Sequence, residues 1–378
     1  MEVLFQGILN VSAQSFIMIG VGIVLIMLAV KKNYEPMLLL PIGFGAILVN
    51  LPFSAVWEFE GEIGVLQVFY NAGILTEIFP VLIFVAVGAM IDFSVLLKNP
   101  KMLFLGAAAQ FGIFATVVVV VMLSGVLPLE IDLKSAAAIG ILGTADGPTS
   151  IFVAARFAPH LLGPITVAAY SYMALVPIIQ PPIIKALTTK QERLMRMDAS
   201  DKKVSKTALI MFPIVVTIIA GLLVPVAVPL VGLLMFGNLI RESGVLERLS
   251  KTAQNELANL VTLLLGITIG ATMYYYYFLR LSTLVVLGLG LVAFSFDTAG
   301  GVIFVKILNI FSKNKINPMI GAAGISAFPM SARLVQKMAS EEDPTNFILM
   351  PAVSANVAGQ VASAIAGGMV LAIVPWLL

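Results

Sequence analysis

Long apolar segments recur along almost the entire chain, and they restrict its fold more than any other feature. A helix needs about 20 predominantly apolar residues to cross the hydrocarbon core of a bilayer. Apolar residues make up 60% of the 378 and charged residues 11%, whereas soluble domains are about half apolar and a quarter charged. We predict an all-α polytopic membrane protein with about ten spans. Its apolar segments lie at 15–31, 36–50, 79–97, 102–126, 135–155, 162–187, 208–224, 229–240, 258–279, 282–305, 317–336 and 346–378.

Basic residues are distributed unevenly between these segments and indicate the orientation of the chain. They concentrate in loop 188–206 and in alternate loops near Lys32, Lys101, Arg248 and Lys313. The positive-inside rule assigns such loops to the cytoplasm. We therefore predict a multi-pass protein of the bacterial inner membrane, with loop 188–206 in the cytoplasm and both termini outside.

The loops on the opposite side carry acidic and aromatic residues. "WEFEGE" (57–62) and "PLEID" (128–132) are acidic, and Trp57, Trp376 and the run Tyr274–Tyr277 fall on the same side. Tryptophan and tyrosine gather at membrane–water interfaces, so the tyrosine run is interpreted as an interfacial anchor. For the loops to alternate between the two sides in this way, segments 135–155 and 317–336 must each enter and leave the membrane on the same side. Both are therefore predicted to be re-entrant.

The two re-entrant segments are similar in sequence. "IGILGTADGP" (139–148) aligns without a gap with "IGAAGISAFP" (320–329), and upstream Phe44–Gly45 matches Phe236–Gly237 and Gly88–Ala89 matches Gly270–Ala271. Five crossings in each half are an odd number, so the second half is inverted relative to the first. Such repeats are typical of transporters whose site lies where broken helices meet. We predict two inverted-topology repeats at 1–187 and 208–378, each with about five transmembrane helices and a re-entrant hairpin or broken helix, joined by a basic cytoplasmic linker at 188–207.

Asp146 lies in the middle of the first re-entrant segment and is followed by Gly147 and Pro148. Glycine and proline break a helix and free backbone carbonyl groups, which is tolerated at membrane depth only inside protein or beside a wet cavity. An acid at the bilayer centre costs about 2.5–3.5 kcal/mol and usually marks function. Together with the hydroxyls of Thr149 and Ser150, the carboxylate suits Na⁺ or H⁺; capping of the following half-helix is the structural alternative.

The second re-entrant segment supplies Asn317, Gly321, Ser326 and Arg333 in "NPMIGAAGISAFPMSAR". Asn317 precedes a proline and is typical of a helix N-cap. An arginine in an apolar layer needs an anionic partner, so we expect Arg333 to face Asp146 or a carboxylate-bearing substrate. The alternative is that Arg333 snorkels to the cytoplasmic interface.

The last segment of each half also carries polar side chains. Tyr170, Tyr172 and Gln180 lie among prolines in the first half, and "AVSANVAGQVAS" contributes Asn356, Gln360 and Ser363 in the second. Asn356 suits Na⁺ as a neutral ligand, or it holds helices together beside small residues. The chain has no cysteine, a single histidine and no phosphate-binding loop, which excludes thiol chemistry, multi-histidine metal sites and ATP hydrolysis by this chain alone.

The chain contains five long motifs: "GTADGPTSIF", "AAYSYMALVPIIQPPIIKALTTKQER", "FGNLIRESGVLERLS", "SKNKINPMIGAAGISAFPMSAR" and "SANVAGQVASAIAGG". They resemble those of one known family, the beta subunits of the biotin-dependent sodium-pumping decarboxylases. The resemblance implies that the chain decarboxylates carboxybiotin, presented in trans by a biotin carrier, and couples this reaction to Na⁺ export with proton consumption. It implies no covalently bound cofactor.

The resemblance also implies residue roles and partners. Catalysis is expected from Arg333, Asp146 and Tyr172, and carboxybiotin binding from Arg333, Asn317 and Ser326. Na⁺ binding is expected from Asp146, Asn356, Asn317, Gly321, Ser326 and Thr149. The expected partners are a cytoplasmic carboxyltransferase alpha subunit, a biotin carrier gamma subunit, a small single-span membrane subunit, further copies of this chain in a homotrimer, and the lipid bilayer, with no nucleic acid.

The acyl substrate is left open by these motifs. Loop 52–78 is short, whereas oxaloacetate-type members of the family carry a longer insertion there, so a methylmalonyl-CoA or glutaconyl-CoA decarboxylase complex is favoured over an oxaloacetate one. The rival function is a secondary Na⁺ symporter or antiporter without enzymatic chemistry. A structural membrane scaffold leaves Asp146 and Arg333 in the apolar layer unexplained.

Overall fold

The computed structural model describes residues 7, 9–32, 36–59, 61–124, 131–197 and 203–378, so parts of loops 128–132 and 188–207 and of the N-terminus lie outside the described residues. Each predicted apolar segment forms helix. The predicted fold class, an all-α polytopic membrane protein with broken helices, is confirmed. The described strands are only β1 (Glu58–Phe59) and β2 (Glu62–Ile63), an antiparallel pair in which Glu58 is opposite Ile63.

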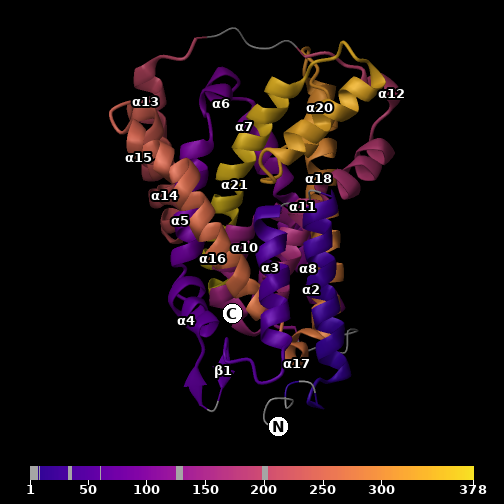
Figure 1. Ribbon diagram of the computed structural model, residues 1–378. Coiled ribbons are helices and arrows are strands. Elements are labelled where there is room, and N and C mark those ends of the chain that lie inside the picture. The colour runs from indigo at the N-terminus through magenta and orange to yellow at the C-terminus, as the bar shows by residue number, and fades with distance from the viewer. Residues whose placement is uncertain (1–6, 8, 33–35, 60, 125–130, 198–202) are drawn as a thin grey trace.

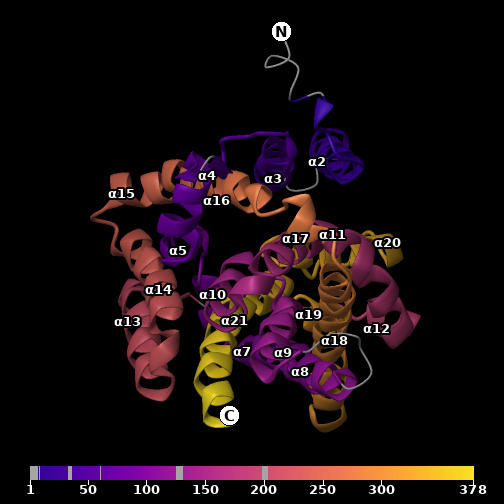
Figure 2. The ribbon, with the colours of Figure 1, turned by 90° about the horizontal axis from the view of Figure 1, so that it is seen from below.

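The helices form two sets that lie side by side (Figure 2). The outer set comprises α2 (Ala13–Lys32), α3 (Pro36–Asn50), α5 (Ile78–Met90), α13 (Lys206–Leu223), α14 (Val228–Ser243) and α16 (Ala258–Ala271). The hairpin set comprises α7 (Met102–Ala109), α8 (Phe111–Leu123), α9 (Leu133–Gly140), η2 (Ile141–Thr144), α10 (Gly147–Phe157), α11 (Leu162–Leu187), α18 (Leu281–Phe311), α19 (Met319–Ala322), α20 (Met330–Glu342) and α21 (Leu349–Trp376).

Short elements connect these helices, some within one set and some between the two sets. They are α4 (Val65–Phe69), η1 (Tyr70–Ile74), α6 (Ser94–Lys98), η3 (Pro159–Leu161), α12 (Lys190–Arg193), η4 (Pro225–Ala227), α15 (Glu247–Thr252), η5 (Ala253–Leu257) and α17 (Tyr275–Phe278). Both sets take helices from both halves of the chain. The halves therefore interlock instead of forming separate bodies.

Within the described residues, six helical stretches are long and apolar enough to span a membrane, and two bent pairs would raise the number to eight. One of the expected spans, α3, has 15 residues, and at 1.5 Å per residue it is shorter than the hydrocarbon core of about 30 Å. Another, α16, continues a helical stretch that begins at Glu247 and carries charged residues in its first turns, and this stretch is not among the six.

Glycines allow the helices of the outer set to cross closely. A Cβ atom on Gly45 of α3 would collide with the backbone of α16 near Gly270, and one on Gly88 of α5 would collide with the backbone of α14 near Gly237. The repeat alignment matches Gly45 with Gly237 and Gly88 with Gly270. Exchanging the two halves of the chain therefore converts one crossing into the other, as two inverted copies require. The boundaries of the repeats stay a prediction.

Charged and aromatic elements sort to opposite ends of the molecule (Figure 1). The upper end carries α6, α12 and the start of α13, with Lys98, Arg193 and Lys206. The lower end carries β1, α4 and the tyrosine-rich α17. This separation agrees with the charge pattern of the sequence, and we assign the upper end to the cytoplasm as a prediction from the positive-inside rule.

Candidate functional site

The first re-entrant segment folds into a broken hairpin, which we call hairpin 1: α9, η2 and α10. The break lies at Ala145, whose φ of 50° is rare for a residue with a side chain and costs of order 1–3 kcal/mol. Asp146 follows in extended conformation as the N-cap of α10, and its Oδ1 accepts a hydrogen bond of 3.4 Å from the Thr149 backbone N–H. The capping role proposed as the structural alternative is therefore real, and it leaves the other carboxylate oxygen for further partners.

The second oxygen of Asp146 binds two hydroxyl groups. Thr149 Oγ1 donates to Oδ2 at 2.7 Å, and Ser363 Oγ of α21 donates to the same atom at 2.8 Å. The side chain is only 6% exposed, and no ion pair reaches it from the residues that the structure describes. Every described neighbour of this carboxyl group is therefore neutral, and a buried charge without a charged partner is costly.

The tip of the second broken hairpin, which we call hairpin 2 (α19 and α20), touches the break of hairpin 1. Ser326 donates to the Thr144 carbonyl oxygen from its backbone N–H at 3.2 Å and from its hydroxyl at 2.8 Å. Gln360 of α21 donates to the Ser326 carbonyl, and Asn356 Nδ2 donates to the Ile325 carbonyl at 2.6 Å. The predicted meeting of the two broken segments is therefore observed directly.

Asn356 is left with an unused acceptor. Its Oδ1 is fully buried and has no hydrogen-bond partner in the described part of the chain. A buried acceptor without a partner is costly, so the atom is suited to receive a ligand. Asn356, Asp146, Thr149 and Ser326 together offer carboxylate, amide and hydroxyl oxygens, the donors that Na⁺ prefers.

A cavity of about 400 Å³ lies beside this oxygen cluster, between the outer set and the hairpin set. Asp146, Tyr170, Ser326 and Gln360 line it from the hairpin set, and apolar residues of α3 and α5 line it from the outer set together with Asn259 and Thr262 of α16. Sequence reasoning did not point to Asn259 or Thr262, because single polar residues in an apolar helix are common. The cavity gives Asp146 a route of access from between the two sets.

Two tyrosines of α11 are placed differently from the expectation. Tyr170 lies against Gly147, lines the Asp146 cavity, and has a buried hydroxyl without a described partner. Tyr172, the residue expected to act, points to α18, where its hydroxyl donates to the Leu287 carbonyl. Residues two positions apart on a helix point in directions about 200° apart, so only one of the two tyrosines faces Asp146.

Arg333 does not face Asp146 in this structure. It lies on the exposed face of α20 and lines a separate cavity of about 420 Å³ with Pro177, Pro181 and Lys337. Its neighbours Ala332 and Leu334 are buried, so the helix turns the guanidinium toward solvent. The expected pairing of Arg333 with Asp146 is therefore not observed. The snorkelling alternative describes this position better, because a solvated guanidinium avoids the cost of burial.

Asn317 and Gly321 also lie away from the oxygen cluster. Asn317 donates to the carbonyls of Arg193 and Met195 at 3.0 and 2.9 Å, and its Oδ1 accepts from the Met319 N–H at 3.0 Å. Its polar atoms are thus occupied by the linker and by the start of α19, which is the N-cap alternative. Gly321 lies against the backbone of Gly301, where a Cβ atom would collide with the Gly301 carbonyl oxygen. Neither residue is placed to bind Na⁺ together with Asp146.

The linker residues 188–197 dock at the upper end of the hairpin set. Arg193 pairs with Glu342 at 2.6 Å, and Arg196 pairs with Asp343 at 2.9 Å. Hydrogen bonds from the Thr345 hydroxyl and from Arg196 lower the pKa of Asp343 to about 2. This carboxylate therefore remains charged at every physiological pH, so the docking does not depend on pH there.

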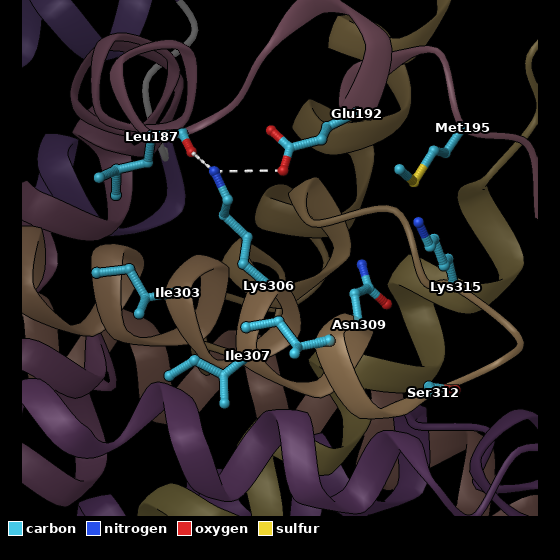
Figure 3. Close-up of a pocket in the computed structure, with 10 residues that line it drawn as sticks. Leu187, Glu192, Met195, Ile303, Lys306, Ile307, Asn309, Ser312 and Lys315 are labelled. Atoms are coloured by element: carbon cyan, nitrogen blue, oxygen red, sulfur yellow. Dashed lines mark hydrogen bonds and ion pairs between the residues drawn. The ribbon is translucent and has the colours of Figure 1, made fainter.

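A further cavity of about 750 Å³ lies beneath the linker (Figure 3). Lys306 of α18 crosses it, donating to the Leu187 carbonyl at 3.0 Å and pairing with Glu192 at 3.2 Å. Partial burial opposes ionisation of Glu192, but hydrogen bonds from Thr189 and Lys306 outweigh it and lower the pKa of this carboxyl. The pair of Lys306 and Glu192 therefore connects the linker to α18 across this cavity.

Comparison with known proteins decides the family. Residues 14–374 match the family described as the Na⁺-transporting oxaloacetate decarboxylase beta subunit. The chain belongs to this family. The membership confirms the prediction made from the sequence motifs, and it makes the chain a beta subunit of a multi-subunit Na⁺-transporting decarboxylase.

Curated relatives of this beta subunit act on different substrates. The oxaloacetate decarboxylase beta chain of Haemophilus ducreyi is 47% identical, with 97% of each chain covered. The methylmalonyl-CoA decarboxylase subunit beta of Propionigenium modestum is 48% identical over 97% of this chain and 96% of the relative. The glutaconyl-CoA decarboxylase subunit beta of Acidaminococcus fermentans is 51% identical over 95% and 92%.

Proposed function

We propose that this beta subunit decarboxylates carboxybiotin at the cytoplasmic face of the bacterial inner membrane and uses the reaction to export Na⁺. The N–carboxylate bond of carboxybiotin breaks, CO₂ leaves, and the ureido nitrogen takes up one proton. A soluble carboxyltransferase and a biotin carrier supply the carboxybiotin. The oxygen cluster around Asp146, at the junction of two broken hairpins, is the observation that carries the transport part of this proposal.

Na⁺ is assigned to the carboxylate of Asp146, the hydroxyls of Thr149 and Ser326, and Oδ1 of Asn356. The unpartnered Asn356 oxygen supports this assignment, as does the fact that no basic side chain among the described residues pairs with Asp146. Backbone carbonyls at the hairpin breaks are further hard-oxygen donors. Bound Na⁺ would neutralise the buried carboxylate, which lowers the cost of holding it in the membrane.

Carboxybiotin is assigned to the Arg333 cavity. A guanidinium binds a carboxylate through two parallel hydrogen bonds, and Arg333 is exposed and lines a cavity that a carrier-bound carboxybiotin could enter. The separation of Arg333 from Asp146 supports a mechanism in which decarboxylation and Na⁺ binding are coupled through movement of hairpin 2. Asn317 and Tyr172 then act by positioning the linker and α11, because both are engaged in structural hydrogen bonds.

A decarboxylation is a plausible energy source for this transport. Moving one positive charge outward against 100 mV costs about 2.3 kcal/mol before any concentration difference is added. The chain itself has no phosphate-binding loop. The energy therefore has to come from a partner's substrate or from an existing ion gradient.

Relatives of three substrate types match this chain, and we infer its acyl substrate from the lengths of their alignments. Alignment with the oxaloacetate chain of H. ducreyi extends over 423 residues, longer than the 378 of this chain, and therefore contains insertions relative to it. The methylmalonyl-CoA and glutaconyl-CoA alignments extend over 387 and 358 residues. The absence of long insertions in these two alignments favours an acyl-CoA decarboxylase complex. We further propose that the complex contains a small single-span subunit and a homotrimer of this chain.

Transport and chemistry are tested together by Asp146→Asn in the reconstituted complex. The amide keeps the N-cap but loses the charge, so both Na⁺ uptake into inverted vesicles and CO₂ release are expected to fall on the order of a hundredfold. Wild-type complex without Na⁺ serves as the control, and its CO₂ release is also expected to stop. Decarboxylation that is indifferent to Na⁺ in the wild type would instead favour a separate symporter.

A further inference from the structure

Asp297 is a second acid in the interior of the hairpin set, and the sequence reasoning passed over it. It lies near the middle of α18 and is fully buried. The signal that singled out Asp146, an acid within a long apolar segment, was equally available in "LVAFSFDTAGGVIF". This carboxyl group belongs neither to the proposed Na⁺ site nor to the proposed carboxybiotin site.

The surroundings of Asp297 offer no opposite charge. Elements α7, α8, η2 and α19, which pack on α18, contain no ionisable residue. Lys134 is at the far end of α9, Lys185 is exposed on α11, and Tyr172 is bound to Leu287. Tyr170 faces Gly147, and Lys306, the other charged residue of α18, pairs with Glu192.

Two glycines make room for the carboxylate. Gly112 of α8 lies against Oδ1, and Gly143 of η2 lies against Oδ2, so that a Cβ on either would collide with the carboxylate. The backbone N–H groups of Gly112 and Ile113, at the start of α8, are beside it. Neither oxygen forms a well-aligned hydrogen bond within the described residues. The group thus rests between a helix N-terminus and hairpin 1 without being held by either.

The inverted repeat indicates that this carboxylate is not required for packing. Gly143 is matched by Gly324 of hairpin 2, and Gly324 occupies the equivalent position against α7. There the side chain that meets the glycine is the methyl group of Ala109. The same crossing therefore packs with a methyl group in one half and carries an acid in the other.

We propose that Asp297 is a proton-binding site of the hairpin set, separate from the Asp146 cluster, which takes up and releases a proton during transport. The N-terminus of α8 favours the anionic form, whereas burial without a counter-charge favours the neutral form. The surroundings therefore accommodate both forms. Gly143 is three residues before Asp146, so a movement of hairpin 1 that accompanies Na⁺ exchange would also change the surroundings of Asp297.

The proposal rests on the proposed function for its place in the transport cycle, but its first test does not need decarboxylation. Infrared spectra of the full chain in lipid vesicles, recorded across a pH series, detect the C=O stretch of a protonated carboxyl group. A band that shifts in D₂O, changes with pH and disappears in Asp297→Asn is expected. If Asp297→Asn removes no pH-dependent band, Asp297 is only a cap for α8 and the proposal is overturned.

The second test uses turnover of the reconstituted complex. Asp297→Asn retains an acceptor for the α8 N–H groups but cannot exchange a proton, so Na⁺-coupled decarboxylation is expected to fall on the order of a hundredfold while Na⁺ binding is retained. Asp297→Glu is expected to restore part of the turnover with a displaced pH profile. Wild-type turnover and an unchanged pH profile in Asp297→Asn would refute a proton-binding role.

The two tests separate this proposal from the proposed function. A wild-type complex that releases no CO₂ in the presence of Na⁺ and acyl substrate would refute the decarboxylation proposal. The pH-dependent carboxyl band would still decide the role of Asp297 in that event.

Discussion

At the scale of single residues, the sequence predicted Asp146 as a site residue and expected Arg333 to face it or a carboxylate-bearing substrate, whereas Arg333 does not face Asp146 in the structure. An acid before Gly-Pro in an apolar segment is detectable from sequence because each residue type has a local physical meaning. The partner is not, because it depends on which face of α20 points inward. Ala332 and Leu334 are buried and Arg333 is exposed, and the neutral hydroxyls of Thr149 and Ser363 meet the carboxylate instead.

Ser363→Ala tests whether these hydroxyls belong to the Na⁺ site. The substitution removes a 2.8 Å hydrogen bond to Asp146, and bonds to charged groups contribute about 1.5–3 kcal/mol. The Na⁺ concentration for half-maximal decarboxylation should therefore rise roughly tenfold or more. Ser354→Ala is a matched control on the same helix, because that hydroxyl donates to the Val95 carbonyl instead. Equal Na⁺ responses of the two variants would remove Ser363 from the site.

Arg333→Ala tests the separation of the two sites. Loss of the bidentate contact should reduce decarboxylation of carrier-bound carboxybiotin roughly tenfold to a hundredfold, and Arg333→Lys should recover only part of it. Na⁺ binding, measured by equilibrium dialysis of the purified complex, should be unchanged because Arg333 lies in another cavity than Asp146. Weakened Na⁺ binding in Arg333→Ala would mean that the two sites share this residue.

At the scale of elements, the positions of the helices were predictable and the breaks only in part. Hydropathy alone located every apolar segment, and proline and glycine located the broken hairpins. The division of segment 102–126 at Gln110 was not predicted, since glutamine does not break helices. Neither was the role of Gln180, which donates to the Ala322 carbonyl at 3.0 Å and accepts from Ser331 at 2.8 Å. Contacts between segments more than a hundred residues apart leave no local signal in one sequence.

Gly88→Ala tests the crossing of α5 and α14. The added methyl group would collide with the Leu234 carbonyl, so the helices must separate. Overpacking of this kind destabilises by about 1–3 kcal/mol. Thermal unfolding in detergent should show a lowered transition temperature. Gly288→Ala in α18 has open space around its Cα and is expected to unfold at the wild-type temperature or above, because alanine favours helix. Equal transitions would contradict the close crossing.

At the scale of the whole molecule, the two helix sets meet where α21 packs on α14 and where α10 packs on α5. One ion pair also joins them near the lower end, where both Arg156 nitrogens Nε and Nη2 contact Glu77 at 2.7 and 3.0 Å. Arg156 lies in the last turn of α10, in hairpin 1, and Glu77 precedes α5 of the outer set. Any displacement of the hairpin set against the outer set must therefore break this pair, which is partly exposed and contributes little to stability.

The orientation of the whole molecule is tested by single cysteines, because the natural chain contains none. Gln191 lies in the docked linker and Glu62 in the strand pair at the opposite end, and both are exposed. With eighteen or so basic residues on the linker side, the positive-inside rule requires Gln191→Cys to react with a membrane-impermeant maleimide only in inverted vesicles. Glu62→Cys should react only in right-side-out vesicles. The opposite pattern would place Arg333 outside, where a cytoplasmic biotin carrier has no access, and would refute the proposed direction of transport.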